Sequence, residues 1–211
     1  METCLISKPN SGATRLVVAC SSYGDHGNPP GFEWVNLLTD QAVNLLWLRD
    51  PLQHWYLGGL PEIGDLQASA EFVREFAQGQ HVTITGSSMG GFGALLYGAL
   101  IQADEVVAFA PQTNLTEAWM AGIDDQRWPV KMREVREAGY SPLDLQPLFE
   151  HSRPKRTRIY YDSASPDAVR DAARLAAYAE LTDVGEGHHE CAYTLARTGR
   201  MLPLLDLPIQ P

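Results

Sequence analysis

The chain has 211 residues, of which 45% are hydrophobic and 20% charged, and these values suit a single domain with one large core. Its formal net charge of −10 disfavours nucleic-acid binding, because phosphate contacts require clustered Lys and Arg. The three cysteines form no Cys-x-x-Cys pair, which favours a reducing compartment. The sequence shows neither an apolar run of about 18 residues nor a signal-peptide core. We therefore expect a cytoplasmic protein without a membrane partner.

Short apolar runs bounded by polar turn residues predict buried strands. These runs cover residues 16–20, 43–48, 81–85, 105–110, 158–161 and 181–184. Helices are predicted at 34–38, at 65–78, after Gly90, at 166–179 and at 190–198. The alternation of short strands and helices favours an α/β fold: a mainly parallel sheet covered on both faces, or three-layer α/β/α sandwich. Ligands of such sheets bind at the carboxyl ends of the strands.

Residues 112–156 interrupt this alternation. They contain two helical stretches, near 115–120 and 130–138, and they lie between two predicted strands. One interpretation is an insertion that forms a lid or cap over the strand ends. The other is an ordinary crossover helix with irregular ends. In either case, residues 1–211 are expected to form one domain that includes this segment.

The most specific motif is the run 86–91, which reads Gly-Ser-Ser-Met-Gly-Gly. It follows a predicted strand and precedes a helix-forming segment, so it matches Gly-x-Ser-x-Gly in the required context. In such a turn Ser88 is strained and its hydroxyl stands clear of the backbone, while side chains at Gly86 and Gly90 would collide with neighbouring elements. The free N–H groups of the following helix favour negative charge beside the serine. We therefore predict Ser88 as a nucleophile; a phosphate-binding turn is disfavoured because no Gly-Lys-[Ser/Thr] ending follows.

A serine hydroxyl is a weak nucleophile without a base, and in this arrangement the base is a late histidine. His151, His188 and His189 follow Ser88 in the sequence. His151 lies in the segment 112–156 and is the poorer candidate. Spacing alone does not separate His188 from His189. A zinc site at this pair is disfavoured because adjacent side chains diverge and no His-Glu-x-x-His spacing occurs, so no metal or cofactor is expected.

The third member of such a site is a carboxylate that orients the imidazole. Asp162 stands at the end of the predicted strand 158–161, and Asp167 lies in the following turn. Pro166 is typical of a first helical residue, so Asp167 could instead serve only as a helix-start carboxylate. Both aspartates remain candidates on this reasoning.

An oxyanion hole requires two backbone N–H donors. Met89, directly after the nucleophile, is predicted to supply one. The second is predicted in the loop after the strand 16–20, from Ser22 or, less favoured, Ser21. The Gly- and Pro-rich residues 24–31 suit a shaped active-site loop.

With these motifs the sequence resembles the α/β-hydrolase superfamily over most of its length, and within it small bacterial esterase-like serine hydrolases. The shared features are the Gly-Ser-Ser-Met-Gly-Gly elbow, an aspartate about five residues past the end of the penultimate strand, and a short final helix after the histidine. The resemblance implies that Ser88, Asp167 and His189 form a catalytic triad, with Asp162 as the alternate acid.

The resemblance also bears on the choice of histidine. In such proteins a leucine often follows the histidine after six residues and a glycine after ten, and Leu195 and Gly199 place it at His189. More distant hydrolases carry Gly-x-Gly-His, which would select His188. One departure concerns the oxyanion loop, where Cys-Ser at 20–21 replaces the usual His-Gly.

The resemblance implies a serine hydrolase that cleaves a small-molecule carboxylic ester or thioester through an acyl-enzyme. An acyltransferase acting on a sugar or amine, and a catalytically idle binding protein with a hydrolase fold, are the alternatives. Four aromatic residues could line its pocket or simply pack in the core: Trp55, Tyr56, Trp119 and Trp128. The natural substrate and the oligomeric state are not indicated by the sequence.

Overall fold

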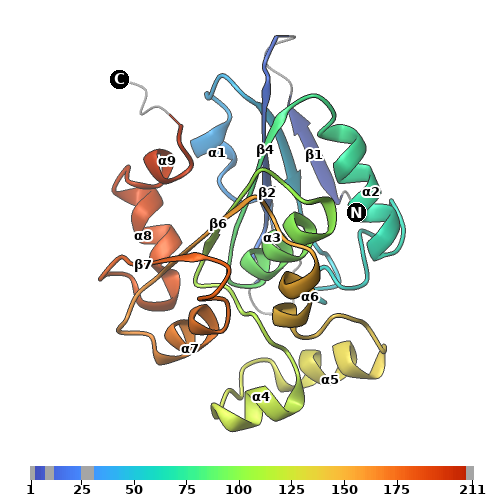
Figure 1. Cartoon of the computed structure of the whole chain (residues 1–211), viewed down its shortest axis with the longest axis vertical. Helices are drawn as coiled ribbons and strands as arrows, with labels where there is room; N and C mark the ends of the chain where they lie inside the picture. The colour runs from blue at the N-terminus through green and yellow to red at the C-terminus, as the bar shows by residue number, and fades with distance from the viewer. Residues whose placement is uncertain (1–2, 8–11, 25–30, 208–211) are drawn as a thin grey trace.

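The computed structural model describes residues 3–7, 12–24 and 31–207, which contain one seven-stranded sheet (Figure 1). The strands are β1 (Cys4–Ser7), β2 (Arg15–Cys20), β3 (Asn44–Leu48), β4 (His81–Ser87), β5 (Glu105–Phe109), β6 (Arg156–Tyr161) and β7 (Glu180–Asp183). Their order is β1-β3-β2-β4-β5-β6-β7. All neighbours are parallel except β1, which pairs antiparallel with β3. The predicted, mainly parallel sheet is confirmed, and the short edge strand β1 is an addition to it.

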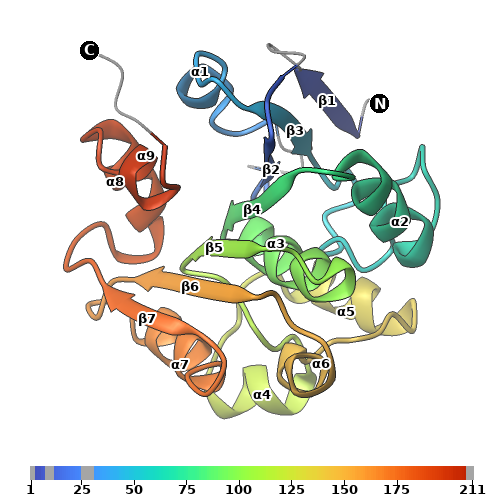
Figure 2. The same ribbon diagram turned by 45° about the horizontal axis from the view of Figure 1, so that its top comes forward.

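The helices form a layer on each face of the sheet (Figure 2). They are α1 (Val35–Leu38), α2 (Leu66–Phe76), α3 (Ser88–Ile101), α4 (Glu117–Gly122), α5 (Pro129–Glu137), α6 (Leu145–His151), α7 (Pro166–Arg174), α8 (Cys191–Arg197) and α9 (Met201–Leu204). Helices α2, α3 and α6 lie on one face, whereas α1, α8 and α9 lie on the other. This arrangement confirms the predicted three-layer α/β/α sandwich.

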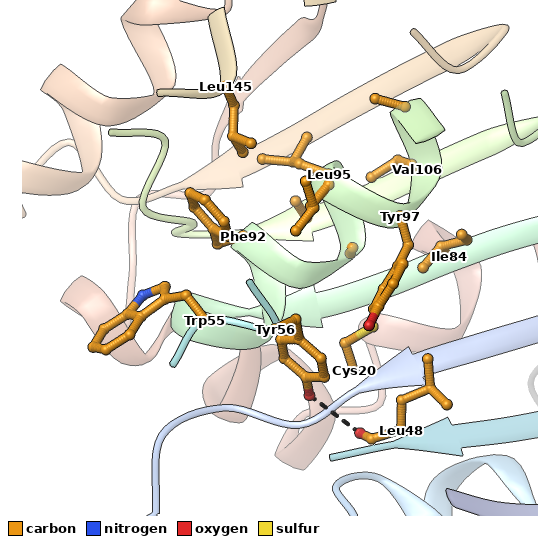
Figure 3. Packing of buried hydrophobic residues seen from close by; sticks show 14 of the residues in the cluster. Cys20, Leu48, Trp55, Tyr56, Ile84, Phe92, Leu95, Tyr97, Val106 and Leu145 are labelled. Carbon is orange, nitrogen blue, oxygen red and sulfur yellow. Dashed lines mark hydrogen bonds between the residues drawn. The ribbon is translucent and has the colours of Figure 1, made fainter. Parts of the chain in front are cut away.

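Successive side chains of each strand point to opposite faces of the sheet, so the core consists of two clusters, one on each face. Val18 of β2 packs with the α3 side, and its neighbour Val17 packs with the α8 side. Both are completely buried, as expected for parallel strands that are covered on both faces. The helix α3 is central, because its residues from Ser88 to Ala99 are all buried. Figure 3 shows Phe92, Leu95 and other core residues packed around this helix.

The segment 112–156 contains three helices with different surroundings. Leu145 and Phe149 of α6 are completely buried in the core beside α3, so α6 is the crossover helix between β5 and β6. Helices α4 and α5 come first in the segment and lie together at one end of the molecule (Figure 1). The interpretation of α4 and α5 as a lid or cap stays a prediction.

No helix in the described ranges has both the length and the apolar character needed to cross a membrane.

Candidate active site

The turn between β4 and α3 places Ser88 at the carboxyl edge of the sheet. Ser88 is the first residue of α3 and has a positive φ of 52°, a conformation that non-glycine residues rarely adopt. A Cβ atom at Gly86 would come within 2.1 Å of the Gly90 carbonyl oxygen, and one at Gly90 within 2.2 Å of the Cys20 carbonyl oxygen. The glycines on either side of the serine are therefore required by close backbone approach, as the sequence motif indicates.

The loop after β7 brings His189 to this serine. The His189 Nε2 atom lies 2.9 Å from Ser88 Oγ, within hydrogen-bond range. Both histidines lie in the 3₁₀ turn η1 (His188–Glu190), but the side chain of His188 is exposed. The backbone N–H of His188 instead donates to a carboxylate oxygen of Asp162 at 2.7 Å. The structure thus brings Ser88 and His189 together and leaves the His188 ring outside the pair.

The opposite nitrogen of His189 is unusual. If Ser88 donates its hydroxyl proton to Nε2, the neutral ring must carry its own proton on Nδ1. In the described part of the chain, Nδ1 is buried and has no hydrogen-bond partner. A buried donor without an acceptor costs about 1–3 kcal/mol. Nδ1 is the nitrogen to which a triad carboxylate would bind, and in this structure it has no acceptor among the described residues.

The two candidate carboxylates have different partners. Asp162 is buried, accepts the Ala164 N–H at 2.9 Å and the His188 N–H at 2.7 Å, and so holds the histidine loop against the end of β6. Asp167, in the first turn of α7, lies 3.1 Å from Arg170 and 4.0 Å from Arg127. Its side chain remains 37% exposed. The assignment of the acid stays a prediction.

Charged groups from two parts of the chain act on the imidazole: Asp125 and Arg127 from the segment before α5, and Asp167 from α7. Burial, reinforced by the positive charge of Arg127, lowers the pKa of His189 to about 4, against opposing effects of Asp167 and Asp125. The Arg127 guanidinium binds both oxygens of Asp125, with Nε–Oδ1 and Nη2–Oδ2 distances of 2.8 and 2.6 Å. The imidazole is therefore neutral at physiological pH and able to accept a proton.

The three residues predicted as sources of the oxyanion donors have different surroundings. Met89 is buried directly behind Ser88. The Ser22 hydroxyl lies 2.9 Å from the Ser87 carbonyl oxygen and 3.1 Å from the Glu33 carboxyl. The Ser21 N–H donates to the Leu48 carbonyl oxygen at 2.9 Å. The side chain of Ser22 is therefore held beside the elbow, next to a carboxyl group. Residues 25–30 of the predicted active-site loop lie outside the described residues.

Two further side chains complete the surroundings of the nucleophile: Gln112, which sequence reasoning did not select, and Trp55, which it named only as a residue that could line the pocket. Gln112 Nε2 lies 3.1 Å from Ser88 Oγ, and Trp55 Nε1 lies 3.1 Å from Gln112 Oε1. Gln112 lies just past the carboxyl end of β5, and residues at the carboxyl ends of parallel strands are where ligands bind, so its position could have marked it as a site residue. Trp55 carried no comparable signal, since it lies in a loop far from the elbow in sequence.

A cavity of about 440 Å³ opens between α4 and α5. Its lining residues are Glu117, Met120, Ala121, Asp124, Asp125, Gln126, Arg127, Pro129, Met132 and Arg136. Asp125 and Arg127 belong both to this lining and to the charges that act on His189. The cavity thus shares two charged residues with the electrostatic surroundings of His189. Within the described ranges, no group of three or more His, Cys, Asp or Glu residues could hold a metal ion.

Comparison with family models and with curated proteins finds no match, whereas solved structures match over nearly the whole chain. The capsule O-acetyltransferase of Neisseria meningitidis serogroup A is 14% identical, with a TM-score of 0.70 over 97% of this chain and 92% of that one. MenH from S. aureus is 14% identical, with a TM-score of 0.57 over 98% of both chains. XC6422 from Xanthomonas campestris, an α/β serine hydrolase without a lid, is 16% identical, with a TM-score of 0.55 over 99% of this chain and 89% of that one.

These similarities, together with the sheet order and the elbow, show that the chain has the α/β-hydrolase fold. The resemblance seen in the sequence is confirmed at this level. At such low identity the comparisons establish the fold, and the activity has to be argued from the site.

Proposed function

We propose that the chain is a serine hydrolase that cleaves a carboxylic ester or thioester through an acyl-enzyme. The observation that carries the proposal is the 2.9 Å contact between Ser88 Oγ and His189 Nε2 at the start of α3. A nucleophile and a base at this distance, on a strained strand-to-helix turn, form the arrangement that activates a serine hydroxyl. The similar folds of MenH and XC6422 support the class of enzyme.

The proposed reaction proceeds in two halves. Ser88 Oγ attacks the acyl carbon while its proton passes to His189 Nε2, and the carbonyl electron pair moves to the oxygen. The intermediate collapses as the leaving oxygen or sulfur takes the proton from His189, which leaves an acyl ester on Ser88. Water then attacks this ester with the same histidine as base, and the acid is released. The N–H groups of Met89 and Ser22 are proposed to hold the oxyanion.

A fluorophosphonate probe tests this proposal directly, because it reacts covalently with activated serines. We expect the wild-type chain to be labelled and Ser88→Ala to lose all labelling. Ser87→Ala is the matched control, since Ser87 is the adjacent residue and its side chain makes no capping hydrogen bond to α3; this variant should label at close to the wild-type rate. An unlabelled wild type, or undiminished labelling of Ser88→Ala, would contradict the proposal.

An acyltransferase is the second candidate, favoured by the match to the capsule O-acetyltransferase over 97% of this chain. A mutant of that protein has been solved in complex with CoA. The cavity between α4 and α5 could hold an acceptor. With acetyl-CoA as donor, acyl transfer predicts acetylated product and faster CoA release only when a sugar or amine acceptor is added. Release of CoA and acetate without any acceptor would favour hydrolysis.

The pH dependence of labelling should reflect the lowered pKa of His189. Only the neutral imidazole accepts the serine proton, so the rate should be level above pH 5 and fall as the pH drops through about 4. Arg127→Gln removes a nearby positive charge, which makes protonation of His189 easier and raises its pKa. We expect the acid limb to move upward by on the order of one pH unit.

The control for this shift is Arg133→Gln, which makes the same charge change at an exposed position of α5. Its acid limb should coincide with that of the wild type. Coincident profiles for Arg127→Gln and Arg133→Gln would show that Arg127 does not set the pKa of the base.

A further inference from the structure

Gln112 reaches the nucleophile from a different strand than the elbow does. It follows β5, is 4% exposed, and its Nε2 atom lies 3.1 Å from Ser88 Oγ. The same oxygen lies 2.9 Å from His189 Nε2. Ser88 Oγ can donate only one proton but can accept hydrogen bonds as well. An amide donor at Gln112 therefore leaves the hydroxyl proton free to point at the histidine.

The orientation of the Gln112 amide is fixed by Trp55. An indole N–H can only donate, and Trp55 Nε1 lies 3.1 Å from Gln112 Oε1. The amide oxygen must therefore face Trp55, and its NH₂ group must face Ser88. Since the hydroxyl then donates to His189, the hydrogen bonds run in one direction, from Trp55 through Gln112 and Ser88 to His189.

The backbone that carries Trp55 is strained and held by a buried carboxylate. Trp55 and Tyr56 both have positive φ, 55° and 62°, which costs non-glycine residues of order 1–3 kcal/mol each. Asp50 fixes this turn by accepting four backbone N–H groups, with N–O distances of 3.0 Å (Leu52), 3.1 Å (Gln53), 2.6 Å (His54) and 2.9 Å (Tyr56). The two rings lie beside α3 (Figure 3). Strain of this kind persists where a functional geometry requires it.

We infer that Gln112 is a catalytic hydrogen-bond donor to the Ser88 oxygen and that Trp55 is the positioning residue that aims it; the inference rests on the serine-hydrolase function proposed above. The Gln112 N–H withdraws electron density from the hydroxyl and fixes its direction toward His189. When the acyl-enzyme breaks down, Ser88 Oγ is the leaving atom, and the same N–H stabilises the charge that develops on it. Gln112 keeps its protons throughout, and His189 returns the proton to Oγ.

Gln112→Glu tests the donor because the introduced carboxyl donates only when protonated. At pH 8 the ionised carboxylate would repel the developing charge and offer the serine proton a competing acceptor. We expect labelling by the fluorophosphonate probe to be about 100- to 1,000-fold slower than for the wild type at pH 8, by analogy with the loss of one oxyanion donor. The rate should recover as the pH is lowered toward 5, a range in which the wild-type rate is level.

The matched control is Gln67→Glu, the same substitution at an exposed position of α2, which should keep the wild-type profile. An unchanged profile for Gln112→Glu would overturn the inference. So would an equal loss at every pH, because a merely structural role would give that result. In either case the proposed function still stands if the wild type is labelled and Ser88→Ala is not. An unlabelled wild type would overturn the proposed function and this inference together.

Trp55→Phe tests the positioning role and also covers the case in which Gln112→Glu fails to fold. Without the indole N–H, the amide of Gln112 can turn its oxygen toward Ser88. We expect labelling and kcat for a p-nitrophenyl ester to fall about 3- to 10-fold with little change in KM. Trp47→Phe is the control, since Trp47 is equally buried and its Nε1 has no hydrogen-bond partner in the described residues. Equal rates for the two variants would overturn the role of Trp55.

Discussion

Replacement of His189 by alanine should slow both fluorophosphonate labelling and ester hydrolysis by about 10⁶-fold, the size of loss expected when a triad histidine is removed, whereas Ser88→Ala has no oxygen left to label. The reason is geometric, because His189 Nε2 is in hydrogen-bond contact with Ser88 Oγ at 2.9 Å. Without this base the hydroxyl must lose its proton to water, and the leaving group has no acid. Labelling rates measured at pH 7 for the wild type and the variant check the prediction.

The control is His188→Asn, chosen because His188 has a positive φ of 50° and asparagine tolerates that conformation better than alanine does. The exposed ring of His188 makes no contact with the serine, whereas its backbone N–H holds Asp162. An asparagine keeps that N–H, so this variant should label within about threefold of the wild type. A large loss in His188→Asn together with a small loss in His189→Ala would transfer the role of base to His188.

Most of the fold could be predicted from local patterns in the sequence. Completely buried runs such as residues 16–20 are recognisable because a strand covered on both faces is apolar at every position. The edge strand β1 was missed, because it has only four residues and half-exposed side chains such as Ile6. The crossover helix α6 was hidden for a different reason: its seven residues contain a proline and charged side chains, and only tertiary packing shows that Phe149 lies in the core.

Some members of the candidate site could likewise be predicted from the sequence, and others could not. Ser88 could be predicted because the elbow is a local motif in which each glycine has a steric reason. The histidine required the resemblance to known hydrolases, because both His188 and His189 fit the spacing. Trp55 could be named as a residue that could line the pocket, but Gln112 and its contact with Trp55 were not foreseen, since that contact joins positions 57 residues apart in sequence. The contact between the Ser22 hydroxyl and the Glu33 carboxyl could not be predicted either, because it forms only in the folded chain.

The surroundings of His189 Nδ1 bear on the choice between Asp162 and Asp167 as the acid. This buried nitrogen lacks a partner in the described residues, and Asp167 and Asp125 are the carboxylates whose charge acts on the ring. Asp125 is held at both oxygens by Arg127. Asp167 is partly exposed and makes only one contact shorter than 4.0 Å to an arginine, that with Arg170. Our hypothesis is that Asp167, whose charge acts on the ring, supplies the acceptor for Nδ1.

On this basis Asp167→Asn should reduce the labelling rate by about 10⁴-fold, because an amide can donate to Nδ1 and favour the tautomer whose Nε2 carries the proton. That tautomer cannot accept the Ser88 proton. Asp162→Asn should behave differently: one of its two backbone partners, Ala164 or His188, loses its acceptor, so the free energy of unfolding should fall by about 1–3 kcal/mol while the rate stays near that of the wild type. Denaturant unfolding and labelling, measured on both variants, separate the two roles. A stable Asp162→Asn protein with a lost rate, beside an active Asp167→Asn, would make Asp162 the acid and Asp167 only a helix-start carboxylate.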